Sequence, residues 1–519
     1  MIVCVNTGRS YTYGQLRKAC GKLATSLRKC KFLPGDTIAI ILPNIPEFAI
    51  IALAANEAGL RTTLISPAYT KYEIKRQLEN VEAQAIFTFP AKYVAIKASI
   101  EKNSKIRLPI VIVNDGTDAS SISGTIKLDD LMREDIEDSK NWNKLRRYSI
   151  LALFQNIVAN ILQSANPIFC LGEANEHYQD IIPLILPVHH FFGLIVSLYY
   201  YLRIGAKLVC LPQFSIEGFT KLLENHRCTV LHVVPPIVQI MTQNERITSR
   251  HVESLRLILS GAAPLGEKSI AKFQSRFTNA VTFRQGYGAS ELSPIATIGT
   301  ADVSPTSCGY LIPNTQMRIV STQDDTPGRN LGLREVGEIY IRGPQVMKGY
   351  YKNPKATADS MDGDWYKTGD LGYYTEDGLL YVQGRLKEMI KVKGYQVAPI
   401  ELEEVIRNYH DVQDVAVIGV AHDNYGEIPK AFVVPKSGVK INENDLKKFV
   451  AERVAKYKRL GYIQVIESIP KTISGKILRK ELKNIFVDIA LRRCFFFQKS
   501  TSNSSFLQFF NKLTILMHF

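Results

Sequence analysis

The sequence lacks the signals of several specialised protein classes. None of its eight cysteines belongs to a C-x-x-C pair, so a zinc site has no support. Scattered cysteines in a large chain suit a reducing compartment, and the N-terminus lacks the apolar core of a secretory signal peptide. There is no block of about five or six like charges, and no nucleic-acid-binding motif accompanies the basic charge. We therefore expect a cytoplasmic protein that does not bind nucleic acid.

The sequence also lacks an uninterrupted apolar run of the ~20 residues that a membrane-spanning helix needs. Ile181–Leu202 comes nearest, but Pro183, Pro187 and the pair His189–His190 interrupt it near its start. We predict a buried strand followed by a buried helix here, and no transmembrane segment.

What is present is an ordinary globular composition. The chain has 519 residues, of which 46% are hydrophobic and 22% charged. These values exclude global disorder and collagen-like repeats, and at ~150 residues per domain the length predicts several domains. The formal net charge of +15 indicates a solvated basic surface. Attraction of phosphates, acyl carriers or membrane headgroups is the functional alternative.

Short apolar runs alternate with helical patterns along the first half of the chain. The predicted strands are 36–42, 61–66, 85–89, 207–211, 229–234 and 254–259. The predicted helices are 46–60, 71–80, 214–225, 236–242 and 265–277. Because this alternation builds β-α-β units around a largely parallel sheet, we predict an α/β fold class.

The pattern changes twice toward the C-terminus. Short strands and Gly-rich turns begin at Gly337, and a second break falls near Gly384. Beyond it we predict a small α+β domain, with helices at 401–408 and 443–453 and strands at 415–420 and 430–435. The last segment, 486–519, is aromatic and rich in Ser and Asn. We expect a poorly ordered tail, with an amphipathic membrane-contacting helix as the alternative.

Two motifs suggest binding of a nucleotide. In Gln285-Gly-Tyr-Gly-Ala-Ser-Glu291 the glycines allow close approach of a ligand, and a hydroxyl and a carboxylate follow at once. That pair suits a phosphate and its Mg²⁺. In Tyr366-Lys-Thr-Gly-Asp-Leu371 the Asp can accept both ribose hydroxyls, although a turn Asp often bonds its own backbone instead.

Two further motifs are basic. Gly384-Arg-Leu-Lys-Glu-Met-Ile-Lys-Val-Lys-Gly394 carries four cations, which form either a solvated edge or a rim for a phosphate-rich substrate. Pro470-Lys-Thr-Ile-Ser-Gly-Lys-Ile-Leu-Arg-Lys480 places Lys476 in a Ser/Gly-flanked loop, where it can reach a reacting phosphate. A single Lys usually faces solvent, so the order of all four motifs carries the argument.

With these motifs in this order, the chain resembles the adenylate-forming superfamily of acyl-CoA synthetases. It is similar in particular to 4-coumarate–CoA ligases and to beetle-luciferase-like acyl-CoA ligases. The resemblance covers nearly all of residues 8–483. It includes Arg9-Ser-Tyr-Thr-Tyr-Gly-Gln-Leu16, Leu186-Pro-Val-His-His-Phe-Phe-Gly193 and Ser260-Gly-Ala-Ala-Pro-Leu-Gly266.

The resemblance implies a two-step reaction. A carboxylate attacks the α-phosphate of ATP to give an acyl-AMP and pyrophosphate, and the thiol of coenzyme A then forms the thioester. It also implies an N-terminal AMP-binding domain at 1–384, a hinge at 385–387 and a mobile α+β C-terminal lid at 388–485, followed by the atypical tail at 486–519. The lid rotates between the two steps.

The resemblance assigns roles to residues at matching positions. The ATP- and AMP-binding positions are Gly261, Ala262, Ala263, Gln285, Gly286, Tyr287, Ser290, Asp370 and Arg385. Glu291 matches the Mg²⁺-associated carboxylate, and Lys387 matches the hinge. The catalytic positions are Lys476 for adenylation, Lys391 for the thioester step and His190 near the acyl pocket, which Phe192 also lines. Lys393 and Gly394 match coenzyme A contacts. His189 is interpreted as a packing residue.

One departure from the family pattern concerns activity. The family's Ser/Thr/Gly-rich phosphate loop should precede a helix, which Asn156–Gln163 matches, but the chain reads Lys144-Leu-Arg-Arg-Tyr-Ser-Ile-Leu-Ala-Leu-Phe154 ahead of it. No glycine occurs between Gly124 and Gly172. Such a loop wraps phosphates with backbone N–H groups and a lysine. We therefore expect severely reduced adenylation.

The remaining expectations concern substrate, location and alternatives. The segments expected to line the acyl pocket are 190–193, 234–240 and 286–295. Their apolar and aromatic character suits a hydrophobic carboxylic acid, either fatty or phenylpropanoid-type. Many relatives end in a peroxisomal Ser-Lys-Leu-type tripeptide, so a peroxisomal location is the alternative to the cytoplasm. This chain ends in Met517-His-Phe519 instead of such a signal. A catalytically silent nucleotide- or CoA-binding homologue and a luciferase-like oxygenase are the alternative functions. A splicing difference would account for both unusual segments.

Overall fold

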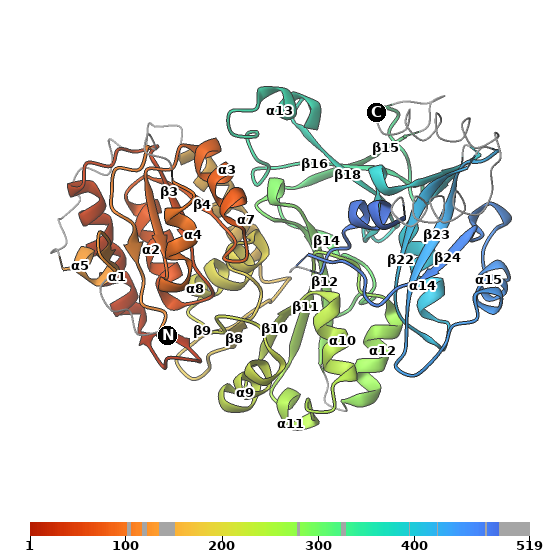
Figure 1. Ribbon diagram of the computed structural model, residues 1–519, viewed down its shortest axis with the longest axis horizontal. Helices are drawn as coiled ribbons and strands as arrows, with labels where there is room; N and C mark the ends of the chain where they lie inside the picture. Colours follow the sequence, from red (N-terminus) through yellow and green to blue (C-terminus); the bar gives the residue numbers. More distant parts are fainter. Residues whose placement is uncertain are drawn as a thin grey trace, which may run out of the picture. The chain divides into compact units, whose positions relative to one another are not determined.

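The computed structural model describes residues 1–100, 105–116, 122–133, 151–277, 281–322, 328–393, 395–422, 424–472 and 475–486. The chain divides into two compact units, Met1–Leu386 and a second that begins at Lys387 (Figure 1). Three parts of the chain for which the sequence provides predictions lie outside the described residues. These are the stretch 144–150, Gly394, and the tail from residue 487 onward.

The first sheet of the first unit is wholly parallel, in the strand order β4-β3-β5-β6-β7. Its strands are β3 (Thr37–Ile41), β4 (Arg61–Leu64), β5 (Ala85–Thr88), β6 (Val111–Ile112) and β7 (Ile126–Lys127). The helices between and beside them are α1 (Tyr13–Lys29), α2 (Pro46–Glu57), α3 (Lys71–Val81), η1 (Pro90–Lys92), α4 (Tyr93–Lys97) and α5 (Leu128–Leu131). Strand β3 is buried at every position, because helices cover both faces of a parallel sheet. The predicted β-α-β alternation is confirmed here.

The second sheet has the order β2-β1-β9-β8. Its strands are β1 (Ile2–Cys4), β2 (Ser10–Tyr11), β8 (Ile181–Leu184) and β9 (Lys207–Cys210). The apolar stretch 181–202 forms β8, then a π-helix η2 (Phe192–Tyr199) that continues into α8 (Tyr200–Ile204). The prediction of a strand followed by a helix is confirmed, although the sequence did not reveal the π geometry. None of the helices in the described ranges is both long enough and apolar enough to cross a membrane.

The third sheet has the order β10-β11-β12-β13-β14 and carries part of the candidate site on its central strands. The strands are β10 (Val230–Val233), β11 (Leu257–Ser260), β12 (Thr282–Gly288), β13 (Ile295–Ile298) and β14 (Tyr310–Leu311). The associated helices are α7 (Leu151–Ser164), α9 (Ile216–His226), α10 (Pro235–Gln243), α11 (Ser249–Val252), α12 (Glu267–Arg276) and η3 (Ser290–Leu292). Helices α10 and α12 lie side by side against this sheet (Figure 1).

The fourth sheet is antiparallel and completes the first unit. Its strands are β15 (Gln316–Val320), β16 (Gly337–Arg342), β17 (Met361–Asp362), β18 (Trp365–Tyr374) and β19 (Leu380–Arg385), and α13 (Pro354–Ser360) precedes β17. Short strands were predicted from residue 337 onward, but β18 has ten residues. It is longer because it pairs with β16 on one side and with β19 on the other.

The second unit is an α+β domain around one sheet, in the order β21-β20-β23-β22 with β24 beside β23. The strands are β20 (Ile390–Val392), β21 (Tyr395–Val397), β22 (Val412–His422), β23 (Gly426–Pro435) and β24 (Tyr462–Val465). The helices are η4 (Leu386–Glu388), α14 (Pro399–Arg407), α15 (Glu443–Ala451) and η5 (Lys456–Lys458), and a further helical stretch spans 479–486. Strands β22 and β23 form one long hairpin, so both extend well past the predicted 415–420 and 430–435.

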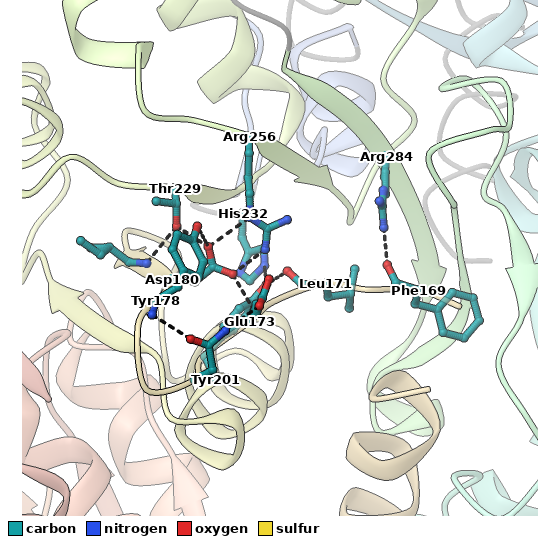
Figure 2. A network of polar contacts seen from close by, with 12 residues as sticks. Phe169, Leu171, Glu173, Tyr178, Asp180, Tyr201, Thr229, His232, Arg256 and Arg284 are labelled. Carbon is teal, nitrogen blue, oxygen red and sulfur yellow. Dashed lines mark hydrogen bonds and ion pairs between the residues drawn. The ribbon is translucent and has the colours of Figure 1, made fainter. Parts of the chain in front are cut away.

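A buried polar network fixes the start of β8, which leads into the Leu186–Gly193 motif (Figure 2). The Asp180 carboxylate is fully buried and accepts hydrogen bonds from Thr229 Oγ1 at 2.6 Å and Tyr178 Oη at 2.7 Å. Arg256 donates to both Asp180 oxygens, and the Glu173 backbone N–H donates at 2.6 Å. Burial raises the pKa of Asp180, but the hydrogen bonds from Arg256, Thr229 and Tyr178 outweigh it, and the net pKa is lowered.

Candidate active site

The adjacent parallel strands β11 and β12 bring two of the predicted nucleotide motifs together. Ser260 on β11 pairs in register with Gln285 on β12, so Gly261 and Gly286 follow at the same level. The buried Gln285 side chain binds the protein itself. Its Oε1 accepts from the Leu265 backbone N–H at 2.7 Å, and its Nε2 donates to the carbonyls of Leu265 and Pro305. Gln285 therefore braces the 261–266 segment, and only its backbone and that of Gly286 are left to line a ligand.

The segment after β11 turns sharply beside an aromatic ring. Ala262 has φ 67°, a left-handed conformation that non-glycine residues rarely adopt. A Cβ on Gly261 would lie only 3.0 Å from Cε1 of Phe192. Phe192 in turn packs beside His232, with 5.9 Å between the ring centroids. A residue larger than glycine at 261 would displace Phe192, so these two predicted site residues are sterically coupled.

Asp370 is the centre of a compact polar cluster. Strands β18 and β19 pair Asp370 with Arg385 in register, and Arg385 Nε lies 3.0 Å from Asp370 Oδ1. Tyr287 on β12 donates its hydroxyl to Asp370 Oδ2 at 2.8 Å. Burial, followed by the Asp370 charge, holds the pKa of Tyr287 well above its usual value, so Tyr287 stays a donor. Three predicted nucleotide-binding residues from three strands thus meet at one carboxylate.

Glu291 lies in η3, immediately after exposed Ser290. Its Oε1 accepts a hydrogen bond from Tyr350 Oη at 2.8 Å, and its backbone carbonyl accepts from Met347 N at 2.7 Å. Within the described ranges no cluster of three or more His, Cys, Asp or Glu side chains is present. A single carboxylate still fits Mg²⁺, which binds through one or two carboxylates together with substrate phosphates.

Helix α7 is anchored to the same part of the unit by side-chain amides. Asn156 Nδ2 donates to the carbonyls of Pro344 and Val346 at 2.6 and 2.8 Å. Asn160 exchanges two hydrogen bonds with the backbone of Ile295. The predicted helix over Asn156–Gln163 is therefore confirmed, and its first turns are tied to the segment that also holds Glu291.

The two motif histidines have different surroundings. His190 is exposed, and its Nδ1 accepts a hydrogen bond from the Phe192 backbone N–H at 3.2 Å. A ring nitrogen that accepts here leaves Nε2 to carry the proton of the neutral imidazole. His189 is largely buried, and burial followed by the His190 charge lowers its pKa to about 4. His189 is thus neutral near pH 7, in keeping with its interpretation as a packing residue.

The predicted lysines of the second unit lie on three separate features: strand β20, the short helix η4 and the hairpin of Lys476. Lys391 and Lys393 alternate with buried Val392 along and just after β20, so both face solvent. The Lys393 Nζ lies 4.3 Å from the centre of the Tyr425 ring, and its backbone N–H donates to the Tyr425 carbonyl at 2.8 Å. Lys387 lies in η4, at the boundary between the units.

Lys476 lies in a short hairpin that its backbone helps to close. The Lys476 N–H donates to Thr472 Oγ1 at 3.0 Å, and the Thr472 N–H donates to the Lys476 carbonyl at 2.8 Å. Just after the hairpin, Arg479 donates to Glu403 Oε1 at 2.6 Å and lies 3.4 Å from Glu388 Oε2. Arg479 therefore ties the base of the Lys476 hairpin to α14 and η4.

The sequence matches two protein-family models. Residues 1–143 and 151–351 match the family described as AMP-binding enzyme, and residues 401–476 match the AMP-binding enzyme C-terminal domain. The chain belongs to the AMP-binding enzyme family. Two curated relatives of this AMP-binding enzyme are plant ligases. The 4-coumarate–CoA ligase 3 of Oryza sativa subsp. japonica is 34% identical over 497 residues, which cover 92% of this chain and 87% of that protein. The 4-coumarate–CoA ligase 1 of Arabidopsis thaliana is 33% identical over 506 residues, with coverages of 92% and 88%.

Solved structures share the fold of this AMP-binding enzyme. ATP-bound MatB from Rhodopseudomonas palustris aligns with TM-score 0.81 and 24% identity, over 94% of this chain and 96% of that chain. A benzoate CoA ligase from Burkholderia xenovorans LB400 aligns with TM-score 0.79 and 22% identity, over 93% and 96%. These likenesses confirm the predicted α/β fold class with a separate C-terminal region. By family, this AMP-binding enzyme is an acid–thiol ligase.

Sequence reasoning missed the residues that hold the predicted ones in place. Tyr350, which binds Glu291, sits in a Gly349-Tyr350-Tyr351 run, and nothing in the run distinguishes the tyrosine that reaches the site. Arg479 occurs inside the Lys476 motif and was read only as part of its basic character. Both contacts join residues far apart in the chain, so spacing alone offers no signal for them.

Proposed function

We propose that the chain is an ATP-dependent carboxylate–CoA ligase with severely reduced adenylation. It would form an acyl-AMP and then an acyl-CoA thioester from a hydrophobic acid of the fatty or phenylpropanoid type. The acid's carboxylate oxygen attacks the α-phosphorus of ATP and pyrophosphate leaves. The thiolate sulfur of coenzyme A then attacks the acyl carbon and AMP leaves. The observation that carries the proposal is the Asp370–Tyr287–Arg385 cluster beside the glycine segments of β11 and β12.

The cluster suits the ribose of a nucleotide. A carboxylate offers about four acceptor positions, and Tyr287 and Arg385 occupy one on each Asp370 oxygen. Asp370 is proposed to accept the ribose hydroxyls, while the ion pair with Arg385 holds its carboxylate in place. The backbone around Gly261, Ala262, Ala263 and Gly286 is proposed to line the adenine, and Ser290 to contact a phosphate.

The cations and the metal are proposed to act on the phosphates. Glu291 would hold Mg²⁺ in the company of the nucleotide phosphates. When bound there, Mg²⁺ neutralises the charge on the phosphate oxygens. Lys476 would stabilise the adenylation transition state, Lys391 would serve the thioester step, and Lys393 and Gly394 would contact coenzyme A. The exposure of Lys391 and Lys393 supports their availability to a polyanionic substrate.

The domain roles are proposed as 1–384 for the AMP-binding domain, 385–387 for the hinge around Lys387, and 388–485 for the lid. The division of the chain at residues 386 and 387 supports a boundary in this region. His190 and Phe192 are proposed to line the acyl pocket, and the apolar character of the neighbouring segments supports a hydrophobic acid. A cytoplasmic location and a peripheral membrane contact of the tail stay predictions.

The missing phosphate loop is the reason for expecting weak adenylation. The match to the AMP-binding family is interrupted at 144–150, the stretch where the glycine-rich loop is absent from the sequence. Without that loop, pyrophosphate loses a cradle of backbone N–H groups as it leaves. The same observation favours a second candidate function, a catalytically silent homologue that binds nucleotide or coenzyme A.

Acid-dependent ATP–pyrophosphate exchange separates the two candidates. We would assay the purified chain with Mg²⁺ and a panel of fatty and aromatic acids, beside Lys476→Ala. Loss of an electrostatic contact of this kind costs ~100-fold or more in rate, so exchange above the Lys476→Ala level supports the ligase. No exchange, with ATP or coenzyme A binding retained by calorimetry, supports the silent homologue. Loss of both exchange and binding contradicts both candidates.

A further inference from the structure

Tyr350 contacts the proposed metal-associated carboxylate directly. Its phenol donates to Glu291 Oε1 at 2.8 Å. The phenol is the donor in this contact, because an ionised carboxylate oxygen can only accept. A second oxygen of the same carboxylate can then face a cation.

Hydrogen bonds hold the backbone around Tyr350 in place and so keep its phenol against Glu291. The Tyr350 N–H donates to Thr357 Oγ1 at 2.9 Å, and the Tyr350 carbonyl accepts from Asn353 N at 3.1 Å. Gly349 has φ 149°, and a Cβ there would lie 2.7 Å from Thr357 Cγ2. The Met347 N–H holds the backbone of Glu291 from the same loop. One loop thus fixes both the main chain and the side chain of Glu291.

We propose that Tyr350 is a positioning residue that orients the Glu291 carboxylate toward a divalent cation bound with a nucleotide. The inference rests on the proposed function, in which Glu291 is the metal-associated carboxylate. An unrestrained glutamate samples many rotamers, and a phenol donating to one oxygen selects the rotamer that presents the other. The hydroxyl of Tyr350 accordingly contributes to cation recruitment and not to nucleotide binding itself.

The neighbouring Tyr351 provides a matched control. It lies one residue further along and is half-exposed, and its ring stacks on the Arg61 guanidinium at 4.5 Å. Tyr350→Phe and Tyr351→Phe each remove one hydroxyl from adjacent positions. Only the first removes a hydrogen bond to Glu291.

The test is Mn²⁺ binding in the presence of ATP, measured by electron paramagnetic resonance on the full chain. Wild type and Tyr351→Phe should recruit Mn²⁺ with the same affinity. Tyr350→Phe should weaken recruitment about tenfold, the effect of losing one hydrogen bond to a charged group. ATP affinity in EDTA should be the same for all three proteins, which a general disruption of the fold would not allow.

Three results would overturn the inference: unchanged Mn²⁺ affinity in Tyr350→Phe, equal weakening in the two variants, or no recruitment by wild type. The inference and the proposed function fail separately. If the chain shows no ATP–pyrophosphate exchange but Tyr350→Phe alone weakens Mn²⁺ binding, adenylation is refuted and the positioning role of Tyr350 stands.

Discussion

At the scale of single residues, the candidate site consists of carboxylates held by partners from distant strands. The sequence predicts a ribose contact for Asp370, and the family resemblance implies a nucleotide-binding role for Arg385, because each lies in a recognisable motif. Their pairing depends on the register of β18 and β19, and Tyr287 joins from another sheet. Local motifs therefore indicated which residues to examine, whereas the geometry depends on long-range pairing, which a single sequence does not reveal.

Replacing Asp370 should selectively weaken nucleotide binding. Asp370→Asn removes the charge that pairs with Arg385 and an acceptor proposed for ribose, so ATP affinity should fall about 10- to 100-fold, the range for hydrogen bonds to a charged group. Isothermal calorimetry checks this. The control is Asp362→Asn, on the neighbouring strand β17, whose exposed carboxylate pairs with Arg318. Equal affinity in the two variants would contradict the role of Asp370.

Asp180 should make stability depend on acid pH. Its pKa in the folded chain is lowered from 3.8, so its contribution is present above that value and is lost as the pH falls through the folded pKa. At pH 7, Asp180→Asn should be less stable than wild type by roughly 3 kcal/mol. Below about pH 4 this difference should shrink, because wild type loses the contribution of the ionised Asp180 and the variant has none to lose. Urea unfolding between pH 7 and 3 measures both effects.

Glu217→Gln is the matched control for Asp180, because Glu217 forms an exposed ion pair with Lys221. Solvent screens an exposed ion pair strongly, so this variant should follow wild type closely at every pH. Parallel pH profiles for wild type and Asp180→Asn would show that the buried network does not set the acid sensitivity.

At the scale of elements, the sequence predicted the parallel β-α-β units well, since their buried strands are continuous apolar runs flanked by helical patterns. It predicted the antiparallel region less well. The lengths of β18 and β22 depend on which strands they pair with, and those partners are remote in sequence. The π geometry of η2 has no pattern of its own, because Phe192–Tyr199 is buried along nearly its whole length and is apolar apart from Ser197.

Arg479 should stabilise the hairpin of Lys476. The side chain of Glu403 is 2% exposed and pairs with both Arg479 and Arg407, so removing Arg479 leaves a buried carboxylate that is only partly compensated. The cost should be below the about 3–5 kcal/mol of a fully broken buried pair. Arg479→Met should increase amide hydrogen exchange in the hairpin 470–478 and in α14. Arg453→Met, which breaks the exposed pair with Glu452, should leave exchange in those segments unchanged. Protection in Arg479→Met equal to that of wild type would contradict the anchoring role.

At the scale of the whole molecule, the chain combines motifs in the family's order with two atypical stretches, 144–154 and 486–519. The clusters around Asp370 and Glu291 lie in the first unit, and the Lys476 hairpin lies in the second. The sequence alone identified the family, since its motifs recur in a fixed order. The proposal of weak adenylation rests on the stretch 144–154, which departs from the family pattern.

The most direct test of this account is ATP–pyrophosphate exchange by the chain in which residues 144–154 are replaced by the family's glycine-rich loop. If the rest of the site is intact, the graft should raise acid-dependent exchange at least about tenfold over wild type, and Lys476→Ala in the graft should abolish the gain. Exchange unchanged by the graft, in a folded protein that still binds ATP, would contradict the claim that the missing loop limits adenylation.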